Sequence, residues 1–185
     1  QTGTLTINKA PATEKLVVDE VTMPADGTKQ AAINLVNPGR YFAAFQFDMV
    51  LPEGIAFAKN DKNKYIVSLN EDRTDDHSIT VSAIGSNTYR FLAYSMSNAQ
   101  ITGNSGTLLS ISICSDANVA DCAKIATLKN LVFTDANSKQ YDLDETTFKI
   151  NIVTPVITAV DKTRVYGDAN PELTFTTTSE LIGIP

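Results

Sequence analysis

The chain has 185 residues, of which 43% are hydrophobic, and a formal net charge of −6 at neutral pH. This length and hydrophobic content suffice for a sizeable core and exclude wholesale disorder. No run of 18 apolar residues occurs, so we expect no membrane insertion in this segment. The acidic surface disfavours nucleic acid as a partner, because phosphate backbones would be repelled. Since the chain begins at Gln1 without an initiator methionine, we expect a mature or trimmed product.

The stretch from Phe42 to Phe57, FAAFQFDMVLPEGIAF, is the centre of the predicted fold. In an extended strand its bulky residues fall on one face, because successive side chains point to opposite sides. Those residues are Phe45, Phe47, Met49 and Leu51. Asp48, which lies between two of them, is predicted to point outward. Pro52-Glu53-Gly54 then predicts a type I turn with proline in its second position.

Other alternating runs predict further strands on both sides of this stretch. They cover residues 15–21, 31–37, 65–69, 78–84, 88–95, 108–114, 124–134 and 147–153. Gly85-Ser86-Asn87 joins two of these runs as a hairpin. No segment combines helical periodicity with caps, and residues 70–76 (NEDRTDD) are predicted to form a solvated acidic loop. The pattern predicts an all-β fold, an antiparallel β-sandwich of the jelly-roll kind with about nine strands.

The strand pattern divides the chain into three parts. Residues 1–14 hold a leading strand at 4–8 and a connector, and residues 15–153 hold the sandwich. Residues 154–185 restart with a strand at 156–160 and are predicted to be a short, β-rich, partial second domain. About 30 residues are too few for a sandwich core. We therefore expect this last part to be poorly ordered or to lean on a neighbour through its unpaired strand edges.

Two cysteines, Cys114 and Cys122, flank a short polar segment. We predict a disulfide between them, since free cysteine is usually buried and this setting is polar. The alternative is two unrelated free thiols. A disulfide would indicate an oxidising, non-cytoplasmic compartment.

No residue pattern indicates catalysis, a cofactor or a metal. His77, the only histidine, follows Asp75-Asp76, which is the ordinary setting of an exposed histidine in a polar loop. The segment TDANSKQYDLDE resembles a calcium loop in composition, through Asp135, Asn137, Asp142 and Asp144. Lys139 and Gln140, however, replace the oxygen ligand and the glycine that an EF-hand loop requires. We predict no enzyme and no metal site of that type, and leave open a looser calcium site here or at 70–76.

Tyrosines offer a platform for sugar rings in principle. The candidates are Tyr41, Tyr65, Tyr89, Tyr94 and Tyr141. Tyr89 and Tyr94 lie five apart, so on one strand they face opposite sides. We therefore expect most of these rings to be half-buried in the sandwich.

Several segments of residues 15–153 carry a resemblance to a known family. They are KLVVDEV at 15–21, FAAFQFDMVLPEGIAF at 42–57, RFLAYS at 90–95, GTLLSISI at 106–113 and TFKINIV at 147–153. This pattern of strands and turns resembles a cohesin-type module, from the wider group of sandwiches shared with cellulose-binding modules. Cohesins bind a calcium-loaded dockerin, so the resemblance implies a protein partner, dockerin-like or another surface protein. This chain holds no dockerin motif.

A second resemblance concerns the two ends of the chain. TRVYGDANPELTFTT at 163–177, with YGDANP at 166–171, is similar to the opening strands of the MBG type of bacterial Ig-like repeat. GTLTINKAP at 3–11 looks like the last strand of the same repeat. This resemblance implies a module spaced off a bacterial cell surface between two repeats.

Together these observations predict a non-catalytic, extracellular interaction or adhesion module of a bacterial surface protein. Its partner would bind a sheet face or the end loops. The alternatives are a carbohydrate-binding module and a structural spacer without a ligand.

Overall fold

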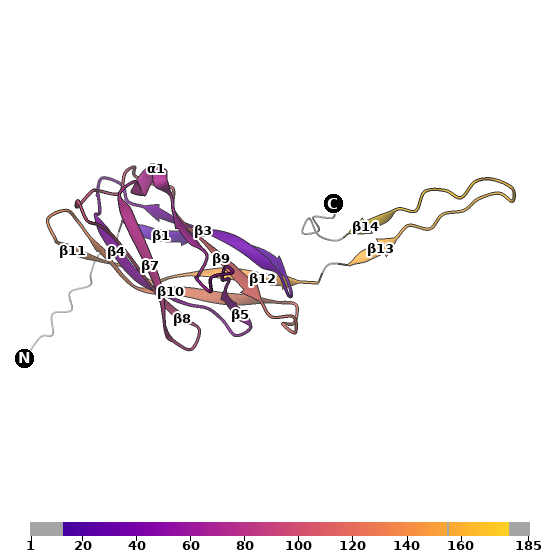
Figure 1. The fold of residues 1–185 in the computed structure, drawn as a ribbon, viewed down its shortest axis with the longest axis horizontal. Helices are drawn as coiled ribbons and strands as arrows, with labels where there is room; N and C mark the ends of the chain where they lie inside the picture. Colours follow the sequence, from indigo (N-terminus) through magenta and orange to yellow (C-terminus); the bar gives the residue numbers. More distant parts are fainter. Residues whose placement is uncertain (1–12, 155, 178–185) are drawn as a thin grey trace, which may run out of the picture.

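The structure, a computed structural model, describes residues 13–154 and 156–177. Two β-sheets pack face to face into a sandwich, and a separate β-hairpin follows it (Figure 1). This confirms the all-β prediction. The predicted leading strand at 4–8 lies outside the described residues.

One sheet of the sandwich has five strands in the order β1–β3–β9–β5, with β6 also paired to β9. The strands are β1 (Lys15–Val18), β3 (Thr28–Val36), β9 (Thr107–Ser115), β5 (Ile55–Phe57) and β6 (Val67–Leu69). All of their pairings are antiparallel.

The other sheet has seven strands in the order β2–β12–β10–β4–β8–β7, with β11 also paired to β10. The strands are β2 (Val21–Pro24), β12 (Thr146–Val153), β10 (Cys122–Thr134), β4 (Ala44–Val50), β8 (Thr88–Ser95), β7 (His77–Gly85) and β11 (Gln140–Leu143). Strands β7 and β8 form the predicted hairpin, and β7 is the last strand at its side of the sheet.

The described sandwich holds twelve strands where about nine were predicted. One reason is that the strand predicted at 15–21 is interrupted by the exposed pair Asp19-Glu20. The first half, β1, joins the five-stranded sheet, whereas β2 crosses to the other sheet and pairs in parallel with β12. The short strand β11 was also missed, because four residues carry too little periodicity to be recognised.

A short helix, α1 (Glu71–Thr74), occupies the segment that was predicted to be an acidic loop. Asn70 caps it: its Oδ1 accepts a hydrogen bond from the amide of Asp72 at 3.2 Å. A four-residue helix shows no apolar period, which is why the sequence pattern did not reveal it. This is the only helix in the described ranges, and no described helix is long and apolar enough to cross a membrane.

The inward face of β4 fills the centre of the sandwich, as predicted. Phe47 and Met49 are fully buried, and Phe45 and Leu51 are at most 2% exposed. The ring of Phe47 stacks on Phe91 of β8 with centroids 4.6 Å apart. A continuous set of aromatic contacts extends from this pair across the core, and it includes Phe42, Phe45, Phe57, Tyr65, Tyr89, Phe133 and Tyr141.

The turn after β4 differs in type from the prediction. The carbonyl of Pro52 accepts a hydrogen bond from the amide of Ile55 at 3.1 Å, so Pro52 is the first residue of the turn. Gly54 is then the third residue, with φ of 79°, which a type II turn requires and a type I turn does not. The type I prediction was wrong because an isolated Pro-Glu-Gly sequence suits either register.

The hairpin after the sandwich consists of β13 (Ile157–Ala159) and β14 (Phe175–Thr177). It extends away from the sandwich, and a long loop joins its two short strands (Figure 1). Its large apolar side chains are exposed, as Leu173 and Val165 show at 86% and 72%. The described part of this segment therefore forms no compact sandwich of its own.

Candidate binding face and end loops

The outward side chains of β10, β4, β8 and β7 form one face of the seven-stranded sheet, called here the outer face. On β8, Tyr89, Phe91 and Ala93 are buried, whereas Leu92 and Tyr94 are 42% and 40% exposed. Apolar side chains of this size on an exposed sheet face are suited to contact with another molecule.

Strand register shows what surrounds these two residues on the outer face. Leu92 is paired with Gln46 on one side and Thr80 on the other. Tyr94 is paired with Ala44 and Ser78. The cross-strand neighbours of the two apolar groups are therefore uncharged, and the next row of the face holds Arg90.

A charged cluster lies one row further along the same face, where Asp48 is paired with Arg90 and Lys129. Arg90 donates two hydrogen bonds to the carboxylate of Asp48, from Nε at 2.7 Å and from Nη2 at 2.9 Å. Asn130 donates a third at 2.8 Å. These bonds, led by those from Arg90, lower the pKa of Asp48 against the opposing effect of burial, and they keep it ionised.

Asp48 points outward, as predicted, yet it is only 2% exposed. The side chain of Arg90 lies over it and stays 42% exposed itself. The outer face therefore presents a guanidinium group at a fixed place, held by a buried carboxylate. The sequence did not reveal this pair, since its members are 42 residues apart and meet only through the strand register.

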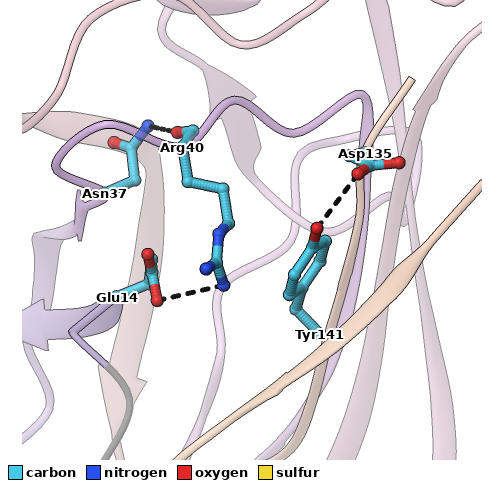
Figure 2. A network of polar contacts seen from close by, with 5 residues as sticks. All are labelled: Glu14, Asn37, Arg40, Asp135 and Tyr141. Carbon is cyan, nitrogen blue, oxygen red and sulfur yellow. Dashed lines mark hydrogen bonds and ion pairs between the residues drawn. The ribbon is translucent and has the colours of Figure 1, made fainter. Parts of the chain in front are cut away.

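At one end of the sandwich, the loop after β3 is held by a second polar network (Figure 2). The Nη1 atom of Arg40 lies 3.4 Å from the buried carboxylate of Glu14. The same guanidinium stacks over the ring of Tyr141, with Cζ 4.2 Å from the centroid. Tyr141 in turn donates a hydrogen bond from its hydroxyl to Asp135 at 3.1 Å. The arrangement ties β11 and the first described residues to this loop.

Arg73 of α1 is a buried cation at the same end, only 7% exposed. Its guanidinium points away from the neighbouring acidic residues and donates hydrogen bonds to oxygen atoms of the interior. They are the carbonyls of Thr102, Gly106, Leu35 and Gly103 and the Oδ1 of Asn37. Burial lowers the pKa of Arg73, although the group stays protonated. Arg73 joins α1 to residues 35–37 and 102–106 and has a structural role that the sequence did not suggest.

His77 begins β7 and is half-buried rather than exposed in a polar loop. Neither ring nitrogen makes a hydrogen bond of normal geometry to a described residue. Burial lowers the pKa of His77, opposed by nearby backbone of Ala43 and Thr74 and by Asp76. Asp76 itself accepts hydrogen bonds from the hydroxyls of Ser95 and Ser97. No described nucleophile is placed beside the imidazole by a hydrogen bond, so the geometry offers no catalytic pair.

Asp135 is the capping residue of a turn. Its Oδ1 accepts hydrogen bonds from the amides of Asn137 at 2.9 Å and Lys139 at 3.0 Å. These bonds lower the pKa of Asp135. Within residues 13–154 and 156–177, no group of three or more histidine, cysteine or acidic side chains is placed to hold a metal ion.

The tyrosines do not share one face. Tyr89 is 9% exposed and Tyr94 is 40% exposed on the opposite side of β8, as the spacing predicted. Tyr65 and Tyr141 are half-buried, while Tyr41 is exposed in the loop before β4. Only Tyr94 of these five lies on the outer face.

The two cysteines are free thiols in the structure. Cys114 lies half-buried in β9 of the five-stranded sheet, and Cys122 lies exposed at the start of β10 in the other sheet. Burial raises the pKa of Cys114. The disulfide between Cys114 and Cys122 stays a prediction.

These observations define the class: a two-sheet, mainly antiparallel β-sandwich module with an exposed sheet face and polar end loops. No family model matches the sequence, and no curated protein matches it. Many solved structures do match the fold, and several of them are cohesins.

One is the sixth cohesin of scaffoldin B from Acetivibrio cellulolyticus, solved with the Cel5 dockerin (TM-score 0.63, 8% identity, covering 77% of this chain and 100% of that one). Another is a non-cellulosomal cohesin from Archaeoglobus fulgidus (TM-score 0.59, 13% identity, 77% and 93%). A third is the seventh ScaB type I cohesin from Pseudobacteroides cellulosolvens (TM-score 0.61, 12% identity, 85% and 98%). The sandwich is therefore cohesin-like in fold, as its strand pattern suggested.

Proposed function

We propose that the sandwich of residues 15–153 is a non-catalytic module that binds a protein partner on the outer face of β10, β4, β8 and β7. One observation carries this proposal: exposed Leu92 and Tyr94 lie on the same face of β8 as the guanidinium of Arg90, which buried Asp48 holds in place. Aromatic, leucine and arginine side chains on one surface supply the apolar area and the fixed donors that protein interfaces use.

The comparisons support a protein partner. Three of the cohesins with this fold were solved as complexes with dockerins. A dockerin-like domain is the partner that we propose for this chain too. A glycan is a weaker candidate, because the outer face carries one exposed tyrosine ring rather than a row of them.

We assign the module to a bacterial cell surface or the extracellular space, with residues 1–14 and 154–185 as parts of flanking Ig-like repeats. The support is the MBG-like sequence YGDANP at 166–171 and the projection of β13 and β14 as a separate hairpin. The boundaries at residues 15 and 153 follow the ends of the described sandwich strands.

The test is capture of a partner with matched variants. The chain is immobilised and exposed to the secreted and surface proteins of its source organism, and retained proteins are identified by mass spectrometry. Leu92→Asp places a charge on the outer face, and Gln30→Asp places the same charge on exposed β3 of the other sheet. We expect one defined protein to bind the unchanged chain and Gln30→Asp but not Leu92→Asp.

Two results would count against this function. If Leu92→Asp captured the partner protein as well as the unchanged chain does, the binding site would lie outside the outer face. Binding on a parallel glycan array, with no captured protein, would replace the protein partner by a carbohydrate.

A further inference from the structure

A second surface lies at the open side of the sandwich, where β6 and β7 face each other from different sheets. Two adjoining clefts follow this side, with volumes of about 540 and 400 Å³. Ile79 of β7 lines both of them. We call the pair the β7 groove. It lies beside the outer face but does not include Arg90, Leu92 or Tyr94.

Apolar side chains form part of the floor of the β7 groove. Half-buried side chains from both strands line it, namely Val67, Leu69, Ile79 and Val81. Alternation along β7 places Ile79 and Val81 on the same side of the strand, two residues apart. An extended chain lying along β7 would place its own alternate side chains against this floor.

The free edge of β7 offers main-chain hydrogen bonds along the groove. Strand β7 is paired with β8 on one side only. Among the described residues, no main-chain group of residues 78–85 has a partner on the other side. This edge, SITVSAIG, contains no charge and no proline, the usual means by which proteins protect an edge from pairing.

The two ends of the β7 groove carry opposite charges. Exposed Glu71 and Asp75 line the end near His77, where β7 begins. Exposed Lys64 lines the other end, beside Thr80 and Val81. A bound chain that runs antiparallel to β7 would therefore match the charges of the groove if it had an acidic residue at its start and a basic residue at its end.

From these three features we propose that the β7 groove binds an extended peptide segment of a partner protein by strand addition to β7. The segment runs antiparallel to β7, as β8 does on the other side, because antiparallel pairing is the more stable of the two directions per residue. The segment carries an acidic residue toward Lys64, apolar residues at alternate positions and a basic residue toward Asp75 and Glu71. Main-chain bonds supply affinity in this mode, and the alternate side chains and end charges supply selectivity.

The probe is the peptide acetyl-Asp-Thr-Val-Thr-Val-Thr-Lys-amide. Its valines would lie opposite Val81 and Ile79, and its lysine opposite His77. The matched control has the same composition with the charges exchanged, acetyl-Lys-Thr-Val-Thr-Val-Thr-Asp-amide. Binding is followed by NMR titration of the ¹⁵N-labelled full chain, reading the amide signals of residues 78–83.

We expect the first peptide to bind about threefold to tenfold more tightly than the control, the range that two exposed ion pairs supply. The double variant Lys64→Glu, Asp75→Lys should reverse this preference, and both positions are exposed, so the fold is retained. Leu92→Asp should leave peptide binding unchanged, which separates the β7 groove from the outer face.

Three outcomes would overturn the proposal. The first is no shift of the β7 amide signals at millimolar peptide, and the second is an equal response to both peptides in both proteins. The third is concentration-dependent dimerisation of the chain alone in analytical ultracentrifugation that the peptide does not reverse, which would make a second copy the occupant.

Discussion

Arg73 is the residue whose chemistry differs most from what its neighbours in the sequence suggest. It stands among four acids in NEDRTDD, yet its guanidinium is buried against neutral oxygens. Five donors in a fixed planar fork allow one side chain to satisfy acceptors from two separate segments of the chain at once. A lysine could not reproduce this geometry, and an apolar residue would leave the acceptors unpaired.

We therefore expect Arg73→Met to lower the free energy of unfolding by about 2–4 kcal/mol, because buried acceptors such as the carbonyls of Thr102 and Gly106 lose their donors. Arg73→Lys should recover only part of this loss. Urea unfolding followed by circular dichroism measures both. The control is Arg164→Met in the exposed tail, which should cause no change. Equal stability of Arg73→Met and the unchanged chain would show that the network is not stabilising.

We expect His77 to make the stability of the fold depend on pH. Its pKa is lowered by burial in the folded chain, while in the unfolded chain it stays near the ordinary value of about 6.5. As the pH falls below that value, the unfolded state binds the proton first, so stability is lost. The lowered pKa of Asp48, by contrast, causes loss of stability only below its ordinary value of 3.8.

The expected result is a decline of the free energy of unfolding between pH 7 and pH 5 that His77→Gln largely removes. Glutamine is neutral throughout this range and has a similar size. Urea unfolding of both proteins at pH 5, 6 and 7 provides the comparison. An identical pH dependence in the two proteins would assign the decline to other groups.

At the scale of single elements, the turn between β4 and β5 depends on Gly54. A Cβ atom at this position would lie 2.3 Å from Cγ2 of Val119, and φ of 79° is unfavourable for alanine and most other residue types. Gly54→Ala should lower the free energy of unfolding by about 1–3 kcal/mol.

Gly85 is the matched control for this turn. A Cβ there would meet only Thr88 at 3.9 Å, an ordinary contact. Gly85→Ala should therefore change stability by less than about 0.5 kcal/mol. Adding Val119→Ala to Gly54→Ala should restore only part of the loss, because it removes the clash and leaves the φ strain. Full recovery in thermal unfolding would mean that the clash alone is responsible.

Strand alternation was enough to predict the strands that build the core. Phe45, Phe47, Met49 and Leu51 are buried as a row because period two is a local property of the sequence. The charged pair of the outer face could not be predicted in this way. That Arg90 covers Asp48 follows from the register of β4 against β8, which no local pattern encodes. Helix α1 and strand β11 are too short to show a period, so they too escaped prediction.

At the scale of the whole molecule, the sandwich and the hairpin of β13 and β14 are separate in their packing. The hairpin is closed by its own pairs, from Ile157 with Thr177 to Ala159 with Phe175. Its described side chains are exposed, and none belongs to the buried core of the sandwich. Stability of the sandwich should therefore not depend on the hairpin.

A chain that ends at Thr154 should consequently unfold at the same temperature as the full chain, within about 2 °C, because the described part of the removed tail contributes no residue to the buried core. Thermal unfolding by calorimetry measures this. Removing β12 as well, by ending the chain at Glu145, is the control that should abolish folding, since Phe148 and Ile150 belong to the core. A marked loss of stability in the first truncation would show that the tail packs on the sandwich, and the assignment of residues 154–185 to a separate repeat would then be wrong.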